Sequence, residues 1–230
     1  MKKKLQTGII LGMIILCQNA FGQTKVLGSD TISNKTATKT YLDLVLNVMG
    51  TNFNYGNSNS ALNDYKRSVL GVQVGVSLQA GITSNFSLVP ELYFTMKGGK
   101  LNAGNPLTTN QSTLHLYAFE LPVLARFHFD SFHINAGPSI AYNFYGTRKI
   151  GDVSADLAFN NSSQGFKRFD AGLQMGGGYT FQTKRKRIAL DLRYNYGLTN
   201  VSNGNQMYNR SFVVSLHFSK AWKTNPFGKK

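Results

Sequence analysis

Half of the acidic residues in this sequence alternate with apolar residues, so their side chains share one face of an extended chain. Five of the ten acidic residues are placed in this way, and four basic residues accompany them. Such a cluster could act in general acid–base catalysis or conduct ions. Alternatively, it forms a buried ion-pair network that neutralises charge inside a narrow barrel, and we favour this structural interpretation. The residues are Asp43, Glu91, Lys97, Glu120, Arg126, Arg168, Asp170, Asp191 and Arg193.

The histidines do not have the spacing of a catalytic or metal site. None of the four forms a pair at the helical or hairpin spacing of metal ligands, although two flank a predicted turn at 130–131 and could approach each other. A hydrolase also needs a carboxylate to orient its histidine, and residues 103–114 contain none. We therefore predict no catalytic residue, no metal site and no cofactor. The histidines are His115, His128, His133 and His217.

The elements that would position these side chains are β-strands, because a two-residue period dominates from Tyr41 onward. In residues 71–82, valine, leucine, alanine and isoleucine alternate with glycine, glutamine and serine. Gly176-Gly177-Gly178 lies within a similar pattern, and no helix follows that would make it a phosphate loop. The pattern predicts eight strands, at 42–48, 71–82, 86–97, 117–129, 132–144, 168–181, 188–196 and 211–218.

The connections between these strands alternate in length. Short turns are expected at 83–85, 130–131 and 183–186, and longer polar loops at 56–67, 103–114, 150–165 and 202–207. This alternation predicts an antiparallel up-and-down sheet with all its long loops at one end, as in outer-membrane barrels. Three prolines lie inside predicted strands, where we expect bulges or strand ends. They are Pro90, Pro122 and Pro138.

The two faces of each predicted strand differ in a way that indicates lipid on the outside. Bulky apolar residues occupy one face, and glycine, serine, asparagine and glutamine crowd the other, which suits the narrow inside of an eight-stranded barrel. Aromatic residues gather near strand ends, as in membrane girdles. A secreted soluble sandwich or lipocalin-like barrel, with the polar face outside, is the alternative. After the N-terminal segment no apolar run approaches the length of a membrane helix, which excludes a helical bundle.

The first residues have the features of a secretory signal peptide. A basic start and an apolar stretch at 5–16 precede small residues at Ala20 and Gly22, so we expect cleavage between Gly22 and Gln23. Cys17 raises lipidation as an alternative, but Leu16 stands where a small residue is expected. A lone cysteine also excludes a disulfide framework and a cysteine zinc site. The predicted organisation is a signal peptide at 1–22, a flexible periplasmic leader at 23–40, a barrel at 41–220 and a basic tail at 221–230.

The chain is strongly basic, with 25 Lys and Arg against 10 Asp and Glu. Its basic residues are dispersed or gathered at 184–187 and in the tail, and an exported barrel does not routinely meet nucleic acid. We expect no nucleic-acid partner. The clusters would instead meet anionic lipid head groups or acidic partners on the periplasmic side. The expected partners are outer-membrane lipid and other envelope or secretion proteins, with the barrel itself a monomer.

Several segments carry a resemblance to a known family: Val89-Pro90-Glu91-Leu92-Tyr93, Lys97-Gly98-Gly99, Phe119 to Phe127, Ala136-Gly137-Pro138, Asp170-Ala171-Gly172 and Asp191 to Thr199. They resemble the PorT-like outer-membrane β-barrel family of Bacteroidota. The resemblance spans about Tyr41 to Phe218 and implies the fold and the outer-membrane location. The resemblance also implies a link to secretion, because the family's eponymous member supports type IX secretion. A basic tail follows Phe218 where such barrels commonly end on an aromatic residue, so the insertion signal is expected to be internal.

Together these observations predict an all-β protein, an eight-stranded antiparallel up-and-down transmembrane β-barrel of the outer membrane. Eight strands leave an interior just wide enough for side chains to fill. We therefore expect a non-enzymatic protein with a structural or interaction role, accessory to secretion or envelope organisation. A small passive pore for ions or small solutes is the alternative.

Overall fold

A computed structural model describes residues 40–182 and 186–220. The predicted signal peptide with its Gly22–Gln23 cleavage site, the basic tail and all but the last residue of the predicted leader lie outside these ranges. Among the described residues, no helix is long and apolar enough to cross a membrane.

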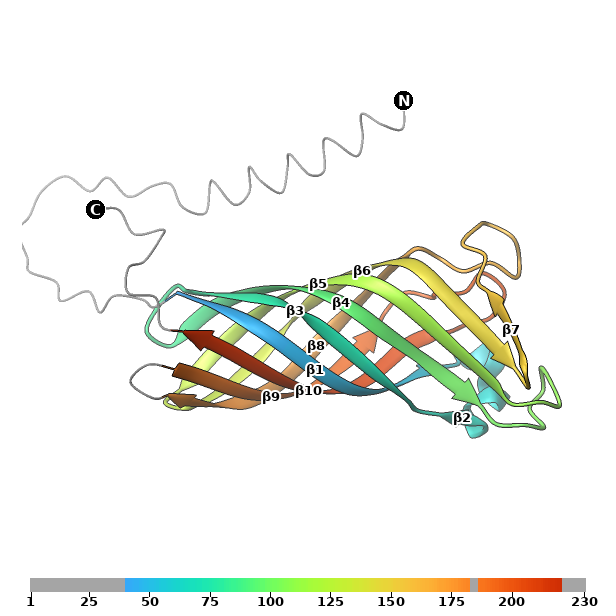
Figure 1. Cartoon of the computed structure of the whole chain (residues 1–230), viewed down its shortest axis with the longest axis horizontal. Coiled ribbons are helices and arrows are strands. Elements are labelled where there is room, and N and C mark those ends of the chain that lie inside the picture. Colours follow the sequence, from blue (N-terminus) through green and yellow to red (C-terminus); the bar gives the residue numbers. More distant parts are fainter. Residues whose placement is uncertain (1–39, 183–185, 221–230) are drawn as a thin grey trace, which may run out of the picture. The chain divides into compact units, whose positions relative to one another are not determined.

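Eight long strands form a closed antiparallel barrel (Figure 1), which confirms the predicted fold. Each long strand pairs with the next along the chain, and β1 pairs with β10 to close the ring. Short strands β2 (Lys66–Arg67) and β7 (Val153–Asp156) pair with β4 and β6, and the 3-10 segment η1 (Asn57–Asp64) follows β1. The long strands are β1 (Tyr41–Asn54), β3 (Val69–Gly81), β4 (Phe86–Leu101), β5 (Ser112–Phe129), β6 (Phe132–Ile150), β8 (Phe169–Gln182), β9 (Lys186–Gly197) and β10 (Tyr208–Lys220).

The two ends of the barrel differ in their connections (Figure 1). At the short-turn end, only Asp130 and Ser131 join β5 to β6, and Asp130 takes a left-handed conformation (φ 54°) that aspartate tolerates. At the loop end, β5 and β6 pair from Ser112 and Ile150, well beyond the predicted limits of 117 and 144. The alternation of apolar outward and polar inward residues does not continue into this extension, because the part of a strand that extends past the lipid bilayer needs no apolar outer face.

The apolar faces of the strands point outward and the polar faces point into the lumen. Val74 is 50% exposed, whereas its neighbour Gln73 is 2% exposed. The same alternation places Leu42, Leu44 and other large apolar residues on the outer surface. This is the reverse of a soluble sandwich or lipocalin, in which the apolar face is inside.

The strands run through all three interior prolines, so the expected bulges or strand ends there are wrong. Pro90 lies opposite Val123, and the register of β4 and β5 is the same on both sides of this pair. Pro122 and Pro138 likewise leave the registers of their strands unchanged. Each proline removes only its own N–H donor, and the long ladders around it hold the register. The register shift between β5 and β6 lies elsewhere, between Tyr117 and Ala118.

Val74 provides a test of the outward face. Val74→Arg places a charge on the lipid face in the middle of β3, and should lower the free energy of unfolding by about 2–4 kcal/mol in lipid vesicles. Leu70→Arg, on the same face near the strand end, should cost less, about 0–1 kcal/mol. Urea unfolding of both variants measures the difference. Equal stability of Val74→Arg and wild type would contradict the outward assignment.

Candidate functional site

Asp191 on β9 lies at the centre of a buried ion-pair cluster in the lumen. Its Oδ2 accepts hydrogen bonds from Arg126 Nη2 (2.8 Å) and Arg193 Nη2 (2.9 Å). Its Oδ1 lies 2.7 Å from His133 Nε2. Arg193 also forms a forked pair with Glu91 on β4, in which Nη2 lies 2.9 Å from Oε1. Asp191 thus links side chains of β5 and β6 directly, and Glu91 on β4 through Arg193.

A second carboxylate extends this cluster toward the short-turn end. Arg187 Nη1 donates to Asp43 Oδ2 (2.9 Å), and Arg187 Nη2 donates to Gln79 (2.7 Å). Arg193 Nη2 lies 3.0 Å from His217 Nε2, and because a guanidinium only donates, this nitrogen of His217 is the acceptor. We call the whole set the central network. Its charges balance, with Asp43, Glu91 and Asp191 against Arg126, Arg187 and Arg193.

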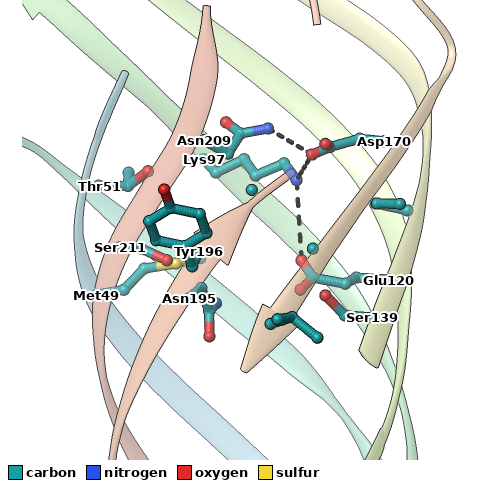
Figure 2. A pocket seen from close by; sticks show the side chains of 15 residues that line it. Met49, Thr51, Lys97, Glu120, Ser139, Asp170, Asn195, Tyr196, Asn209 and Ser211 are labelled. Atoms are coloured by element: carbon teal, nitrogen blue, oxygen red, sulfur yellow. Dashed lines mark hydrogen bonds and ion pairs between the residues drawn. The ribbon is translucent and has the colours of Figure 1, made fainter. Parts of the chain in front are cut away.

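A separate group surrounds Lys97 (Figure 2). It lies nearer the loop end, because Lys97 is close to the residue at which β4 ends, Leu101. Lys97 Nζ lies 3.0 Å from Asp170 Oδ2 and 4.0 Å from Glu120 Oε2. Gln174 donates to Glu120 (2.8 Å), and Asn209 donates to Asp170. The cavity beside this Lys97 group measures about 20 Å³, which is room for roughly one water molecule.

The glycine run of β8 makes space for the central network. A Cβ at Gly178 would lie 2.4 Å from Asp191 Oδ1 and 2.8 Å from His133 Nε2. A Cβ at Gly176 would lie 3.0 Å from Arg193 Cγ. Side chains at these positions would displace the ion pairs, so glycine here serves lumen packing.

Arg168 is not part of the lumen network, which corrects the sequence-based assignment. It is exposed, it lies 5.0 Å from the ring of Phe159, and its Nη1 donates to the backbone oxygen of Phe144 (3.4 Å). β8 begins at Phe169, so the strand alternation that would turn Arg168 inward does not extend to it. The other eight predicted residues all have buried side chains in the lumen.

Arg187, His133 and His217 belong to the central network, although the sequence did not assign them to it. We expected Arg187 in a basic periplasmic cluster at 184–187, but β9 begins at Lys186. Arg187 then shares the inward parity of Asp191 and Arg193, a signal that was present in the sequence. The histidines also stand at inward positions, where a ring nitrogen can complete a buried carboxylate's contacts.

An apolar cluster fills the interior at the loop end. Phe53 and Leu116 point inward from β1 and β5, and Leu62 of η1, Phe166 and Val201 reach them from the loops. Phe53 and Leu62 are each 2% exposed. We call this set, with Tyr55, Leu101, Leu114 and Met207, the loop-end cluster. The lumen is therefore filled by charge pairs in its middle and by apolar packing at one end.

These groups are arranged to hold strands together. The forked Arg193–Glu91 contact and the shared Asp191 oxygens are charge-assisted bonds in a space without bulk water. Within residues 40–182 and 186–220, no three His, Cys, Asp or Glu side chains are placed to hold a metal ion.

Breaking the Arg193–Glu91 pair tests the network. Arg193→Met leaves Glu91 with the hydroxyl of Tyr93 as its remaining partner, and should cost about 3–5 kcal/mol of unfolding free energy. The double variant Glu91→Met/Arg193→Met should regain much of this loss, because apolar replacement of a buried pair is often neutral.

The matched control is the exposed pair between Lys149 and Asp152. Asp152→Asn should change stability by less than about 0.5 kcal/mol, since water screens this pair. Urea unfolding in lipid vesicles measures all three variants. A double variant that is less stable than Arg193→Met would argue against a coupled ion pair.

Comparison with known proteins identifies one family. The profile described as "Outer membrane protein beta-barrel domain" matches residues 42–203. No curated protein sequence matches the chain.

Among solved structures, the chain is similar to small barrels from three bacterial sources. Neisserial surface protein A is 14% identical with a TM-score of 0.45, covering 80% of this chain and 97% of that one. Ail of Yersinia pestis, in complex with the heparin analogue sucrose octasulfate, is 8% identical with a TM-score of 0.41, covering 79% and 98%. OprG from Pseudomonas aeruginosa is 11% identical with a TM-score of 0.40, covering 81% and 97%. None of these likenesses says what this chain binds.

Proposed function

Because the chain belongs to the outer membrane protein beta-barrel domain family and lies in the outer membrane, we propose that it acts as a closed, non-enzymatic barrel with a structural or interaction role. The observation that carries this proposal is the central network. Arg126 and Arg193 are fully buried across the lumen, and both are paired with carboxylates. A barrel filled in this way presents its loops and its outer surface to partners.

The filled lumen argues against the alternative of a passive pore. An ion crossing the barrel would have to separate the Arg126–Asp191 and Arg193–Glu91 pairs, whose side chains are at most 1% exposed. Separating a buried pair costs several kcal/mol because both charges lose their partner in a poorly hydrated space. At the loop end, the ion would also have to pass the loop-end cluster.

Conductance measurements test this closed state. The wild-type protein in a planar lipid bilayer should show no sustained channel above the leak of the bare membrane, with a porin in the same apparatus as the positive control. A stable ohmic conductance that persists through repeated purification, and whose ion selectivity changes in Arg126→Ala while stability does not, would instead establish the pore.

The PorT-like resemblance supports a more specific role within this proposal. The segments that carry the resemblance supply Glu91, Glu120, Arg126, Asp191 and Arg193, which are all lumen residues. The segments that resemble the family therefore include residues that pack the lumen. On this basis we propose that this chain is a PorT-like barrel of Bacteroidota. An accessory role in secretion or envelope organisation is the corresponding function, and crosslinking in cells followed by affinity purification would identify the partners.

The closed sheet supports a monomer as the working unit. Every long strand, from β1 to β10, pairs with a neighbour on both sides, so the barrel has no free strand edge that a second copy could extend.

Outer-membrane lipid is the partner that the surface charge favours. The loop end carries more basic than acidic side chains, and in barrels of this type that end faces outward. We call the basic residues the basic rim. It consists of Lys66, Arg67, Lys100, Arg148, Lys149, Lys167, Arg168 and Arg210, against Asp64, Asp152 and Asp156. Such a rim suits the phosphate groups of lipid head groups.

Replacing part of the basic rim tests this contact. The triple variant Arg67→Gln/Lys100→Gln/Lys149→Gln should lose stability in vesicles that contain anionic lipid, by up to roughly 1 kcal/mol per residue. In purely zwitterionic vesicles, or in high salt, the variant and wild type should differ little because the attraction is absent or screened. The same loss in both kinds of vesicle would show that the rim stabilises the fold and does not bind lipid charge.

A further inference from the structure

A cavity at the loop end of the barrel stands apart from both charge groups of the lumen. It lies between the ends of β4, β5 and β6 and the loops that cover them. Its volume is about 290 Å³. One water molecule occupies about 30 Å³ in the liquid, so this space equals roughly ten water molecules or a ligand with about ten non-hydrogen atoms. The cavity therefore has the size of a small organic molecule.

The walls of this cavity are apolar and polar in similar proportion, and the uncharged polar side chains are those of Thr108, Ser112, Gln164 and Asn205. Leu101 and Leu114 contribute from β4 and β5, Ile150 from β6, and Leu107 and Met207 from the loops. Leu107 is 54% exposed, so the cavity lies at the surface of the loop end. Ligand sites combine apolar surface, which holds the body of the ligand, with polar groups that orient it.

Arg148 carries the only charge among the described residues that line the cavity. Its guanidinium lies over the ring of Phe166, 5.4 Å from the centroid, which holds it in place. Within the described part of the chain, Arg148 donates to no carboxylate. Among the described residues, each other arginine that faces the interior pairs with a carboxylate, whereas the guanidinium donors of Arg148 remain available to a ligand.

Tyr55 places a second donor at the same cavity. Burial raises the pKa of Tyr55 to about 12, so its hydroxyl keeps its proton at neutral pH. Among the described residues this hydroxyl has no hydrogen-bond partner, whereas the backbone of Tyr55 is anchored by Asn63. Arg148 and Tyr55 thus both line this cavity and bring two unused donor groups to it.

We propose that this cavity binds a small organic carboxylate with an apolar body. The carboxylate would accept hydrogen bonds from Arg148, whose planar fork matches two oxygens, and the body would cover the leucine and methionine walls. Inorganic phosphate fits less well, because it has no apolar part and would leave the leucine and methionine side chains exposed to water. This site goes beyond the structural role proposed above, since it gives the barrel a ligand of its own at the outer surface.

Fluorine NMR with 4-fluorobenzoate tests the proposal on the full barrel in lipid nanodiscs. This probe matches the size of the cavity and, being ionised, partitions weakly into lipid. Titration should broaden and shift its signal saturably at millimolar concentrations. The neutral isostere 4-fluorobenzamide should bind at least about tenfold more weakly, the loss expected for a missing charge-assisted hydrogen bond. Inorganic phosphate should not displace the probe.

Variants assign the binding to Arg148. Arg148→Met keeps an apolar side chain over Phe166 and should weaken binding by about tenfold or more, while Arg148→Lys keeps the charge and should weaken it less. Asp152→Asn removes an exposed charge outside the cavity and should leave binding unchanged. The temperature at which each barrel unfolds on gels checks folding. Saturable binding that is equal for wild type and folded Arg148→Met, equal binding of the amide, or no binding by wild type would each overturn the proposal.

Discussion

The narrow lumen of an eight-stranded barrel is the constraint on which the rest of this structure depends. Side chains from opposite walls meet, so a charge that faces inward has no bulk water and must find a partner within the barrel. Asp191 shows the consequence, since one carboxylate is shared by two arginines and a histidine. The glycines of β8 follow from the same constraint, because larger residues would occupy the space of these pairs.

Because the lumen is filled, the surfaces that remain for contact with other molecules are the outer face of the barrel and its loop end. Lipid meets the apolar outer face, and the basic rim lies where lipid phosphates are expected. At the loop end, residues of η1 and the later loops pack into the loop-end cluster, which orders the surface of this end. The cavity beside Arg148 lies within it. The barrel thus separates a sealed interior, which gives stability, from an outer end that is suited to recognition.

The errors of the sequence interpretation have physical causes. Arg168 has the parity of Asp170 but precedes the strand, and alternation has no meaning outside an extended, paired segment. Arg187 was assigned to a turn because it ends a basic run, although its parity with Asp191 was visible. The prolines were expected to break strands, yet long ladders tolerate the loss of one donor. The loop-end extension of β5 was missed because its alternation is inverted there, with Leu114 and Leu116 facing inward and the polar residues Thr113 and His115 facing outward.

The sequence by itself determined the number of strands, their inward and outward faces and most of the lumen charges, because a two-residue period is local and lipid requires it in every strand. Tertiary structure alone decided which charges pair. Arg187 and Asp43 are 144 residues apart, and they meet because closure places β9 and β1 on either side of β10. The cavity at Arg148 also arises only in the fold, where strands and loops distant in sequence converge. No local pattern encodes such meetings, since they depend on the tilt and register of the whole barrel.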